Sequence, residues 1–142
     1  MSTVKKKKKR KTGLNTKAKK KQAVARAVVR LGKGAVKINK RSLNLLEPRQ
    51  LRNFVEEPLK IVPDVAKEVD ISVAVKGGGF MGQAAAARSA IAKGLVLYSK
   101  DEKAKQALLA YDRLLLVDDV RRVESKKPLG TKARKKKQKS KR

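Results

Sequence analysis

Three glycines with a phosphate-binding spacing are the first feature of this sequence that could do chemistry. The stretch SVAVKGGGFMGQAAAARSAIAKGLVLY, residues 72–98, contains Gly77-x-Gly79-x-x-Gly82 between an alternating apolar run and an alanine-rich run. A strand, a glycine turn and a helix in that order form the dinucleotide-binding fingerprint, in which the helix start holds a pyrophosphate. The motif allows two interpretations, a nucleotide cofactor site or a glycine turn with another purpose.

The surrounding sequence argues against the cofactor. A dinucleotide site needs a second parallel strand after the helix, with an acidic residue near its end for the ribose. Asp101 and Glu102 lie near the right distance, but they belong to a segment with the pattern of a helix start. We therefore expect the glycines to allow positive φ angles and close packing. A contact between this turn and a nucleic-acid phosphate is compatible with that role and stays open.

The residue inventory offers no other catalytic site. The chain has no His and no Cys, which removes the commonest general base near neutral pH, the commonest metal ligands and any disulfide framework. No Ser or Lys has an identifiable activating partner, and no carboxylate pair stands out. We therefore expect no catalytic residue, no metal, no cofactor and no small-molecule substrate.

The charge balance indicates a polyanionic partner. Among 142 residues there are 40 Lys and Arg against 12 Asp and Glu, which gives a formal net charge of +28. Such an excess repels itself in a compact chain, and nucleic acid is the leading candidate to compensate it. No apolar run has the roughly 18 residues of a membrane span, and no signal peptide is recognisable. These features predict a cytosolic or nuclear protein.

The excess charge is concentrated at the two ends of the chain. Residues 1–21 carry 11 basic and no acidic residues, and residues 125–142 carry 10 basic and no acidic ones. Neither segment has the apolar content to offset the entropy of ordering, so we expect both to be disordered in isolation. Residues 22–124 can bury a core of their own. We predict a basic N-terminal extension, one globular domain and a basic C-terminal tail with these boundaries.

The globular part has a mixed α and β pattern. Strands are expected over residues 22–31, 35–39, 70–76 and 119–124, and the GKG turn at 32–34 predicts a hairpin between the first two. Ser42 is expected to cap a short helix that ends before Pro48. Longer helices are expected over residues 48–57 (broken by Pro58), 63–69 and 82–98, and from a Ser99–Glu102 capping box to about Tyr111.

Several basic residues are candidates for contacts with RNA. Arg26 and Arg30 share one strand face with two valines, which favours an RNA contact over a merely solvated surface. The C-terminal basic run has the strongest case, because it repels itself without an anion. Arg121 and Arg122 could instead pair with Asp118, Asp119 or Glu124 inside the domain, and both possibilities stay open. Asp112 and Arg113 are expected to form a local pair.

The scarcity of aromatic residues indicates how RNA would be bound. The chain has only two Phe, two Tyr and no Trp. A single-strand reader stacks bases on several aromatic rings of a sheet. We therefore expect recognition mainly by shape and backbone, through Lys and Arg contacts with phosphates.

The glycine stretch also carries a family resemblance. GGGFMGQAAAARSAIAKGL, residues 77–95, resembles the signature of the universal small-subunit ribosomal protein nine family. AVARAVVRLGKGAVKIN is similar to the first hairpin of that family, and YDRLLLVDDVRRVESKKPLG and KKKQKSKR are similar to its late segment and C-terminus. The EP, FMG and YDR elements look archaeal. Gln22 and Lys141 depart from the usual pattern.

The resemblance implies a fold and a role. The implied fold is α+β, a small two-layer α/β sandwich like the second domain of ribosomal protein five, with a left-handed βαβ crossover and disordered basic extensions. The implied role is structural, in the head of the cytoplasmic small ribosomal subunit, among ribosomal RNA and neighbouring head proteins. The tail tip would contact the transfer RNA of the peptidyl site through Lys139, Ser140, Lys141 and Arg142.

The predicted contacts with ribosomal RNA lie in the extension, the domain and the tail. They are Lys19, Lys20, Lys21, Arg26, Arg30, Gly77, Gly78, Gly79, Gln83, Arg121, Arg122, Lys126, Lys127, Lys132, Arg134, Lys135, Lys136 and Lys137. A chromatin-like DNA binder with basic arms is the rival hypothesis, although the tails lack repeated Ser/Thr-Pro-Lys units. The run KKKKKRK could serve as a nuclear address, but the resemblance favours an RNA-binding extension.

Overall fold

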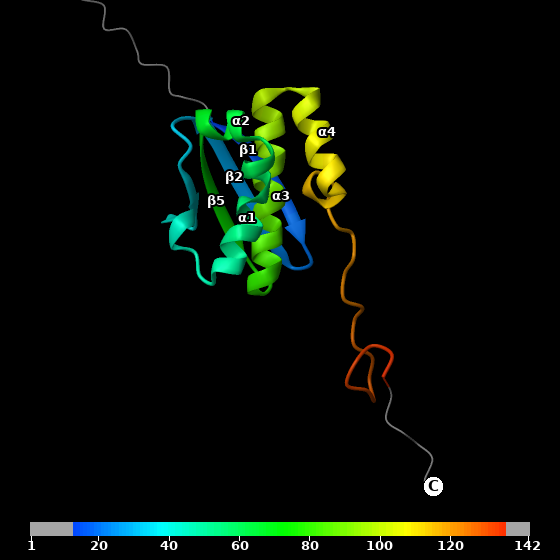
Figure 1. The fold of residues 1–142 in the computed structure, drawn as a ribbon. Coiled ribbons are helices and arrows are strands. Elements are labelled where there is room, and N and C mark those ends of the chain that lie inside the picture. Colours follow the sequence, from blue (N-terminus) through cyan, green and yellow to red (C-terminus); the bar gives the residue numbers. More distant parts are fainter. Residues whose placement is uncertain (1–12, 136–142) are drawn as a thin grey trace, which may run out of the picture.

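A five-stranded sheet with helices on one face forms the folded domain (Figure 1). The computed structural model describes residues 13–135. The strands are β1 (Leu14–Lys20), β2 (Ala23–Leu31), β3 (Val36–Ile38), β4 (Arg41–Ser42) and β5 (Val69–Lys76). The helices are α1 (Arg49–Ile61), α2 (Pro63–Glu68), α3 (Phe80–Ser99) and α4 (Glu102–Tyr111), with 3₁₀ turns η1 (Leu43–Leu45) and η2 (Arg113–Leu115). The expected α+β class is confirmed.

The strand order is β1-β2-β5-β3-β4. The β1–β2, β2–β5 and β3–β4 pairs are antiparallel, and the β3–β5 pair is parallel. A parallel pair needs a crossover connection, and α1 and α2 provide it between the β3–β4 hairpin and β5. The hand of this crossover stays a prediction.

The expected hairpin between residues 22–31 and 35–39 is wrong, because β5 lies between β2 and β3. Asp70, near the start of β5, accepts hydrogen bonds from the backbone N–H groups of Lys33 and Ala35, each at 2.9 Å. These bonds hold the GKG turn against β5 instead of letting the chain fold back onto β2. A turn signal in the sequence shows that the chain reverses but does not show which strand it meets.

The predicted boundary at residue 22 is also wrong, because the sheet begins within the segment expected to be disordered. All seven residues of β1 pair with β2. On the helix-facing side of β1, Ala18 is fully buried and the Thr16 hydroxyl donates to the Ala90 carbonyl at 2.9 Å. Lysines occupy three of the other five positions, so the charge count concealed a strand. Residues 1–12 lie outside the described part.

The core lies between the sheet and helices α1 and α3 (Figure 1). Strand β2 faces it with alanines at 23, 25 and 27, which are at most 1% exposed. Small residues on both sides let α3 lie close to the sheet. At Gly94 the approach is closest, because an added Cβ would stand 2.6 Å from the Val29 Cγ2 atom. The expected strand at 22–31 and helix at 82–98 are confirmed within a few residues.

Helix ends account for two further differences from the expectation. Helix α1 continues through Pro58 to Ile61. Pro58 lies in the last turn, where it removes the backbone hydrogen bond to the Phe54 carbonyl but does not end the helix. The Ser99–Glu102 capping box is not formed, because α3 continues to Ser99 and Lys100 adopts a left-handed φ of 55°. Asp101 caps α4 instead, accepting from the Lys103 N–H at 3.0 Å.

The expected strand at residues 119–124 is absent. Val120 and Val123 are 88% and 84% exposed, and no strand of residues 13–135 pairs with this segment. Alternation of two valines is too weak a pattern without a neighbouring strand to supply hydrogen bonds. The segment after η2 therefore extends from the domain without regular structure (Figure 1).

Candidate nucleic-acid interface

The sheet face opposite the helices is rich in unpaired cations. Alternate residues of the strands point away from the core, and six of these positions carry exposed Lys or Arg side chains. We call them the open-face cations: Lys17, Lys19, Arg26, Arg30, Lys37 and Lys76. Within residues 13–135 none of the six forms an ion pair.

The strand register concentrates this charge. Lys17 lies directly opposite Arg26 in the β1–β2 pair, and Val24 lies between Lys19 on β1 and Lys76 on β5. Like charges directly opposite each other destabilise an antiparallel pair. Asp70 shares this face, but its carboxylate is bonded to the backbone of the GKG turn. The arrangement is therefore unfavourable for an isolated domain and favourable beside a polyanion.

A second group of cations lies where the C-terminal segment leaves the domain, and these are paired. We call Lys20, Lys93, Asp118, Asp119 and Arg121 the exit cluster. Lys93 Nζ lies 2.6 Å from Asp118 Oδ1, and Lys20 pairs with Asp119. Arg121 binds the same Asp119 carboxylate through Nη2 at 2.8 Å and Nε at 3.1 Å. Hydrogen bonds from the Arg121 and Lys20 side chains hold the pKa of Asp119 well below its usual range.

The ion pairs of the domain bear on two expectations from the sequence, the partners of Arg121 and Arg122 and the pair of Asp112 with Arg113. Arg121 pairs inside the domain with Asp119, whereas Arg122 makes no ion pair among the described residues. The expected Asp112–Arg113 pair is wrong. Asp112 binds Arg88 at 2.9 Å instead, and its other oxygen accepts from the Leu114 N–H.

Arg88 is a structural residue that sequence reasoning missed. It is 9% exposed, pairs with Glu57 of α1 at 2.5 Å as well as with Asp112, and lies 4.5 Å from the ring centre of Phe54. These contacts tie α1, α3 and the end of α4 together. The available signal was one arginine among the alanines in the middle of α3.

The glycine turn is a packing device. Gly77 and Gly78 have φ angles of 76° and 66°, and a Cβ on them would stand 2.7 Å from the Gln22 carbonyl oxygen and 3.0 Å from the Ala23 nitrogen. The Gln83 amide donates to the Gly77 carbonyl at 3.2 Å and supports the turn. The expected packing role is confirmed for Gly77 and Gly78. Gly79 caps α3, and nothing lies within 4 Å of its missing Cβ.

The remaining predicted contacts are dispersed. Lys21 lies exposed in the β1–β2 turn, and Arg134 pairs with Glu124 at 2.9 Å within the C-terminal segment. The exposed part of that segment also carries Lys126, Lys127, Lys132 and Lys135. The predicted contacts at Lys136, Lys137, Lys139, Ser140, Lys141 and Arg142 lie outside the described residues. Sequence reasoning missed Lys17, Lys37 and Lys76, because strand register determines which side of the sheet their side chains occupy.

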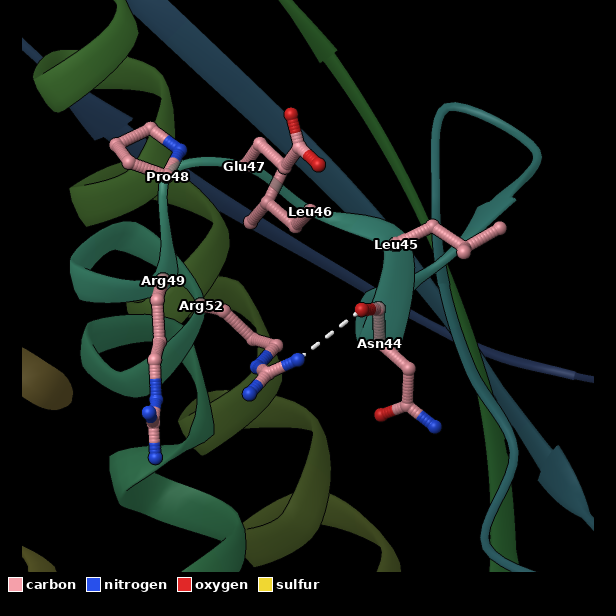
Figure 2. Close-up of a pocket in the computed structure, with 7 residues that line it drawn as sticks. All are labelled: Asn44, Leu45, Leu46, Glu47, Pro48, Arg49 and Arg52. Atoms are coloured by element: carbon pink, nitrogen blue, oxygen red, sulfur yellow. Dashed lines mark hydrogen bonds between the residues drawn. The ribbon is translucent and has the colours of Figure 1, made fainter.

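The hollows of the domain contain no catalytic arrangement. One hollow of about 720 Å³ beside the start of α1 is lined by residues 44–49 and Arg52, and Figure 2 shows Arg52 reaching back to the Asn44 carbonyl at 3.1 Å. In the part of the chain that the structure describes, no three acidic side chains gather as a metal site would require. No helix there is long and apolar enough to span a bilayer.

Known proteins resemble this chain over most of its length. A family model described as Ribosomal protein S9/S16 matches residues 18–142. The "Small ribosomal subunit protein uS9" of Thermoplasma volcanium is 50% identical over 125 residues, covering 88% of this chain and 95% of that protein. Its namesakes in Halobacterium salinarum and Picrophilus torridus are 50% and 48% identical, covering 89% and 86% of this chain and 96% and 92% of the relatives.

Proposed function

The chain belongs to the ribosomal protein S9/S16 family, and we propose that it binds ribosomal RNA of the small subunit through its open sheet face. The family is one of ribosomal structural proteins and not of enzymes, and its archaeal members match this chain over nearly their full length. Its place is the small ribosomal subunit of the cytoplasm. Neighbouring proteins of the subunit head are further proposed partners.

One observation carries the RNA proposal: six cations share a sheet face and form no ion pair within residues 13–135, although Asp70 lies opposite one of them, Arg30. Lys17 and Arg26 are held opposite each other, so the free domain bears a repulsion that RNA phosphates would remove. Folded RNA presents a dense phosphate surface, and its neutralisation releases counterions. Binding should therefore weaken steeply as the salt concentration rises.

The proposed RNA contacts extend beyond the open face. On the domain itself, the further proposed RNA contacts are Lys21 and the exposed glycine turn with its supporting side chain: Gly77, Gly78, Gly79 and Gln83. Arg122, Lys126, Lys127, Lys132, Arg134 and Lys135 continue it along the C-terminal segment, with Lys136 and Lys137 beyond the described part. Lys20 and Arg121, also proposed to contact RNA, bind Asp119 as well, so we propose that they additionally position that segment.

The tail tip is proposed to contact the transfer RNA of the peptidyl site. This step rests on the family resemblance and on the basic run that ends in Lys139, Ser140, Lys141 and Arg142. The described part of the C-terminal segment runs away from the sheet and helices, as such a reach requires (Figure 1). Deletion of residues 135–142 should leave folding and assembly largely intact and weaken binding of transfer RNA to the peptidyl site. Unchanged transfer RNA affinity would contradict this role.

The finer fold assignment is also a proposal. A two-layer sandwich like the second domain of ribosomal protein five is supported by the helices on one sheet face and by the parallel β3–β5 pair. The left-handed crossover is expected with it.

Sedimentation tests the proposed function. A tagged full-length chain in cell lysate should migrate with the small ribosomal subunit on a sucrose gradient at moderate salt and remain there at high salt. Many simultaneous phosphate contacts make dissociation slow. Migration with DNA, or release as free protein at modest salt, would contradict the proposal and favour the chromatin-like alternative.

A further inference from the structure

One aromatic ring of this chain has no structural role in the described domain. All four aromatic residues lie within residues 13–135. Phe54 and Tyr98 pack against the core, and Tyr111 lies with its ring centre 5.8 Å from the Arg88 guanidinium. Phe80, the first residue of α3, is 70% exposed and belongs to neither buried cluster. A ring held in water on so polar a surface suggests a partner.

Phe80 forms one wall of a hollow. The hollow has a volume of about 580 Å³, and Leu45 and Leu46 provide further apolar wall. Leu45 is itself 73% exposed. Polar side chains line the remainder: Asn39, Arg41, Ser42, Glu47 and Gln83. A hollow of a few hundred Å³ with apolar walls and a few polar groups is typical of binding sites for small ligands.

The charge around the hollow favours a nucleotide. Arg41 lines it, and the exposed Lys40 and Lys76 adjoin lining residues in the sequence. Side chains of the Arg, Glu and Gln types recognise base edges by hydrogen bonds. The Gly77–Gly79 backbone precedes Phe80, and the space beside Gly79 is open, so a sugar–phosphate chain can approach without a clash. An apolar side chain of a partner protein would not need the cations that surround this hollow.

We propose that Phe80 stacks on an unpaired nucleobase of the bound RNA, with the base seated in this hollow. The inference rests on the proposed function and deepens it, because it adds one base contact to a surface otherwise made for phosphates. Stacking is tolerant of sequence, since every base has a π face. The ligand class is therefore single-stranded RNA, such as a loop or bulge, rather than a continuous duplex.

A tryptophan at this position provides a direct probe. The chain has no Trp, so Phe80→Trp in the full-length protein introduces a single indole fluorophore. We expect a single-stranded oligoribonucleotide to quench its emission at a salt concentration where heparin, a polyanion without bases, binds and does not quench. Equal quenching by both ligands, or quenching by neither, would overturn the stacking contact.

Affinity measurements separate stacking from apolar contact. Phe80→Ala and Phe80→Leu should each weaken binding of the oligoribonucleotide, on the order of tenfold for Ala, and leave heparin binding unchanged. Leu97→Ala, at an exposed position near the other end of α3, is the matched control and should change neither. Thermal unfolding confirms that each variant is folded.

The outcomes also distinguish this inference from the proposed function. If the unmodified chain binds RNA and both Phe80 variants bind it equally well, the stacking inference fails and the open-face proposal stands. If Phe80→Ala impairs only incorporation into the small subunit, the ring contacts a protein and the inference also fails. If the unmodified chain binds no RNA, the proposed function itself fails.

Discussion

The open sheet face and the exit cluster are both basic, but their charges are arranged in opposite ways. On the open face, Lys17 and Arg26 are held opposite each other without an acidic partner in the described structure. In the exit cluster, Lys20 and Arg121 converge on Asp119, and Lys93 binds Asp118. The acidic residues of a chain with only 12 of them are therefore placed selectively.

This difference separates two uses of a cation. An unpaired cation is available to an external phosphate, whereas a paired cation fixes one part of the chain relative to another. The exit cluster joins β1, α3 and the start of the C-terminal segment. Beyond Arg121, the ion pair between Glu124 and Arg134 lies within the C-terminal segment itself. We infer that the open face binds RNA and that the exit cluster sets where the tail departs.

Charge reversal on the open face should have the largest effect. Replacing both Lys17 and Arg26 by Glu turns two phosphate contacts into repulsions, so RNA affinity should fall on the order of 100-fold. The slope of log affinity against log salt concentration should become shallower by about two. The dissociation constant measured over a range of salt concentrations checks this. The matched control reverses Lys103 on α4 and Arg113 on η2, which are exposed and do not belong to the open-face cations, and should have a much smaller effect.

The single variant Lys17→Glu sharpens the same test. It places opposite charges across the β1–β2 pair, so the free domain should gain roughly 0.2–1 kcal/mol of unfolding free energy. RNA affinity should fall at the same time. A variant that is both less stable and weaker in RNA binding would show that Lys17 serves the fold.

A change in the glycine turn should damage both regions together. Gly78→Val puts a β-branched residue at φ 66°, with its Cβ 3.0 Å from the Ala23 nitrogen. We expect a loss of about 1–3 kcal/mol in unfolding free energy, seen as a lower midpoint of thermal unfolding. Gly79→Ala is the control, because Gly79 has φ −98° and open space around it. A native unfolding midpoint for Gly78→Val would mean that the turn does not need glycine.

Asp119→Asn should affect the exit cluster alone. Without the carboxylate, Lys20 and Arg121 lose their shared partner, and the C-terminal segment should sample a wider range of directions. The chain has no Cys, so spin labels on Leu97→Cys and Thr131→Cys report the distance from α3 to this segment. The distribution should broaden for Asp119→Asn and stay unchanged for Glu124→Gln, whose Arg134 partner lies within the segment. Equal distributions in all three proteins would remove the positioning role.

The same label pair should show no effect of pH as long as the Asp119 carboxylate stays ionised. Arg121 and Lys20 lower the pKa of Asp119 in the folded chain, below its ordinary value of 3.8. The stabilisation from this group is therefore fully present above that ordinary pKa and is lost as the pH falls through the lower, folded-state pKa. The distance distribution should therefore stay constant as the pH falls from about 7 to the ordinary pKa of 3.8, where a free carboxylate would be half protonated. Broadening as the pH approaches 3.8 would mean that the carboxylate is not held by these cations.

Local pattern was sufficient to predict much of the fold. The alternation in β2 and β5 and the periodicity of α3 come from side chains that are buried on one face, so the sequence records them directly. β1 was missed because its buried positions hold Thr and Ala between lysines. The hairpin was misplaced because strand order depends on which strand lies in the centre of the sheet. The hydrogen bonds from the GKG turn to Asp70 of β5 are visible in the structure, but no local sequence pattern predicts them.

The site was predictable where it depends on one strand. Arg26 and Arg30 alternate with the buried face of β2, so their exposure follows from the strand itself. Lys37 and Lys76 join them through the register of three strands, which no short pattern contains. The pairing of Lys20 with Asp119 joins positions 99 residues apart, and charge counts had assigned that lysine to RNA.

Lysine acetylation followed by mass spectrometry is the most direct test of the distinction between the two basic regions. The free chain and the assembled small subunit are acetylated under the same conditions, and the reactivity of each lysine is compared. We expect Lys17, Lys19, Lys37 and Lys76 to react in the free chain and to be protected in the subunit, while Lys20 and Lys93 react slowly in both. Equal reactivity of the open-face lysines in both states would contradict an RNA-binding role for this face.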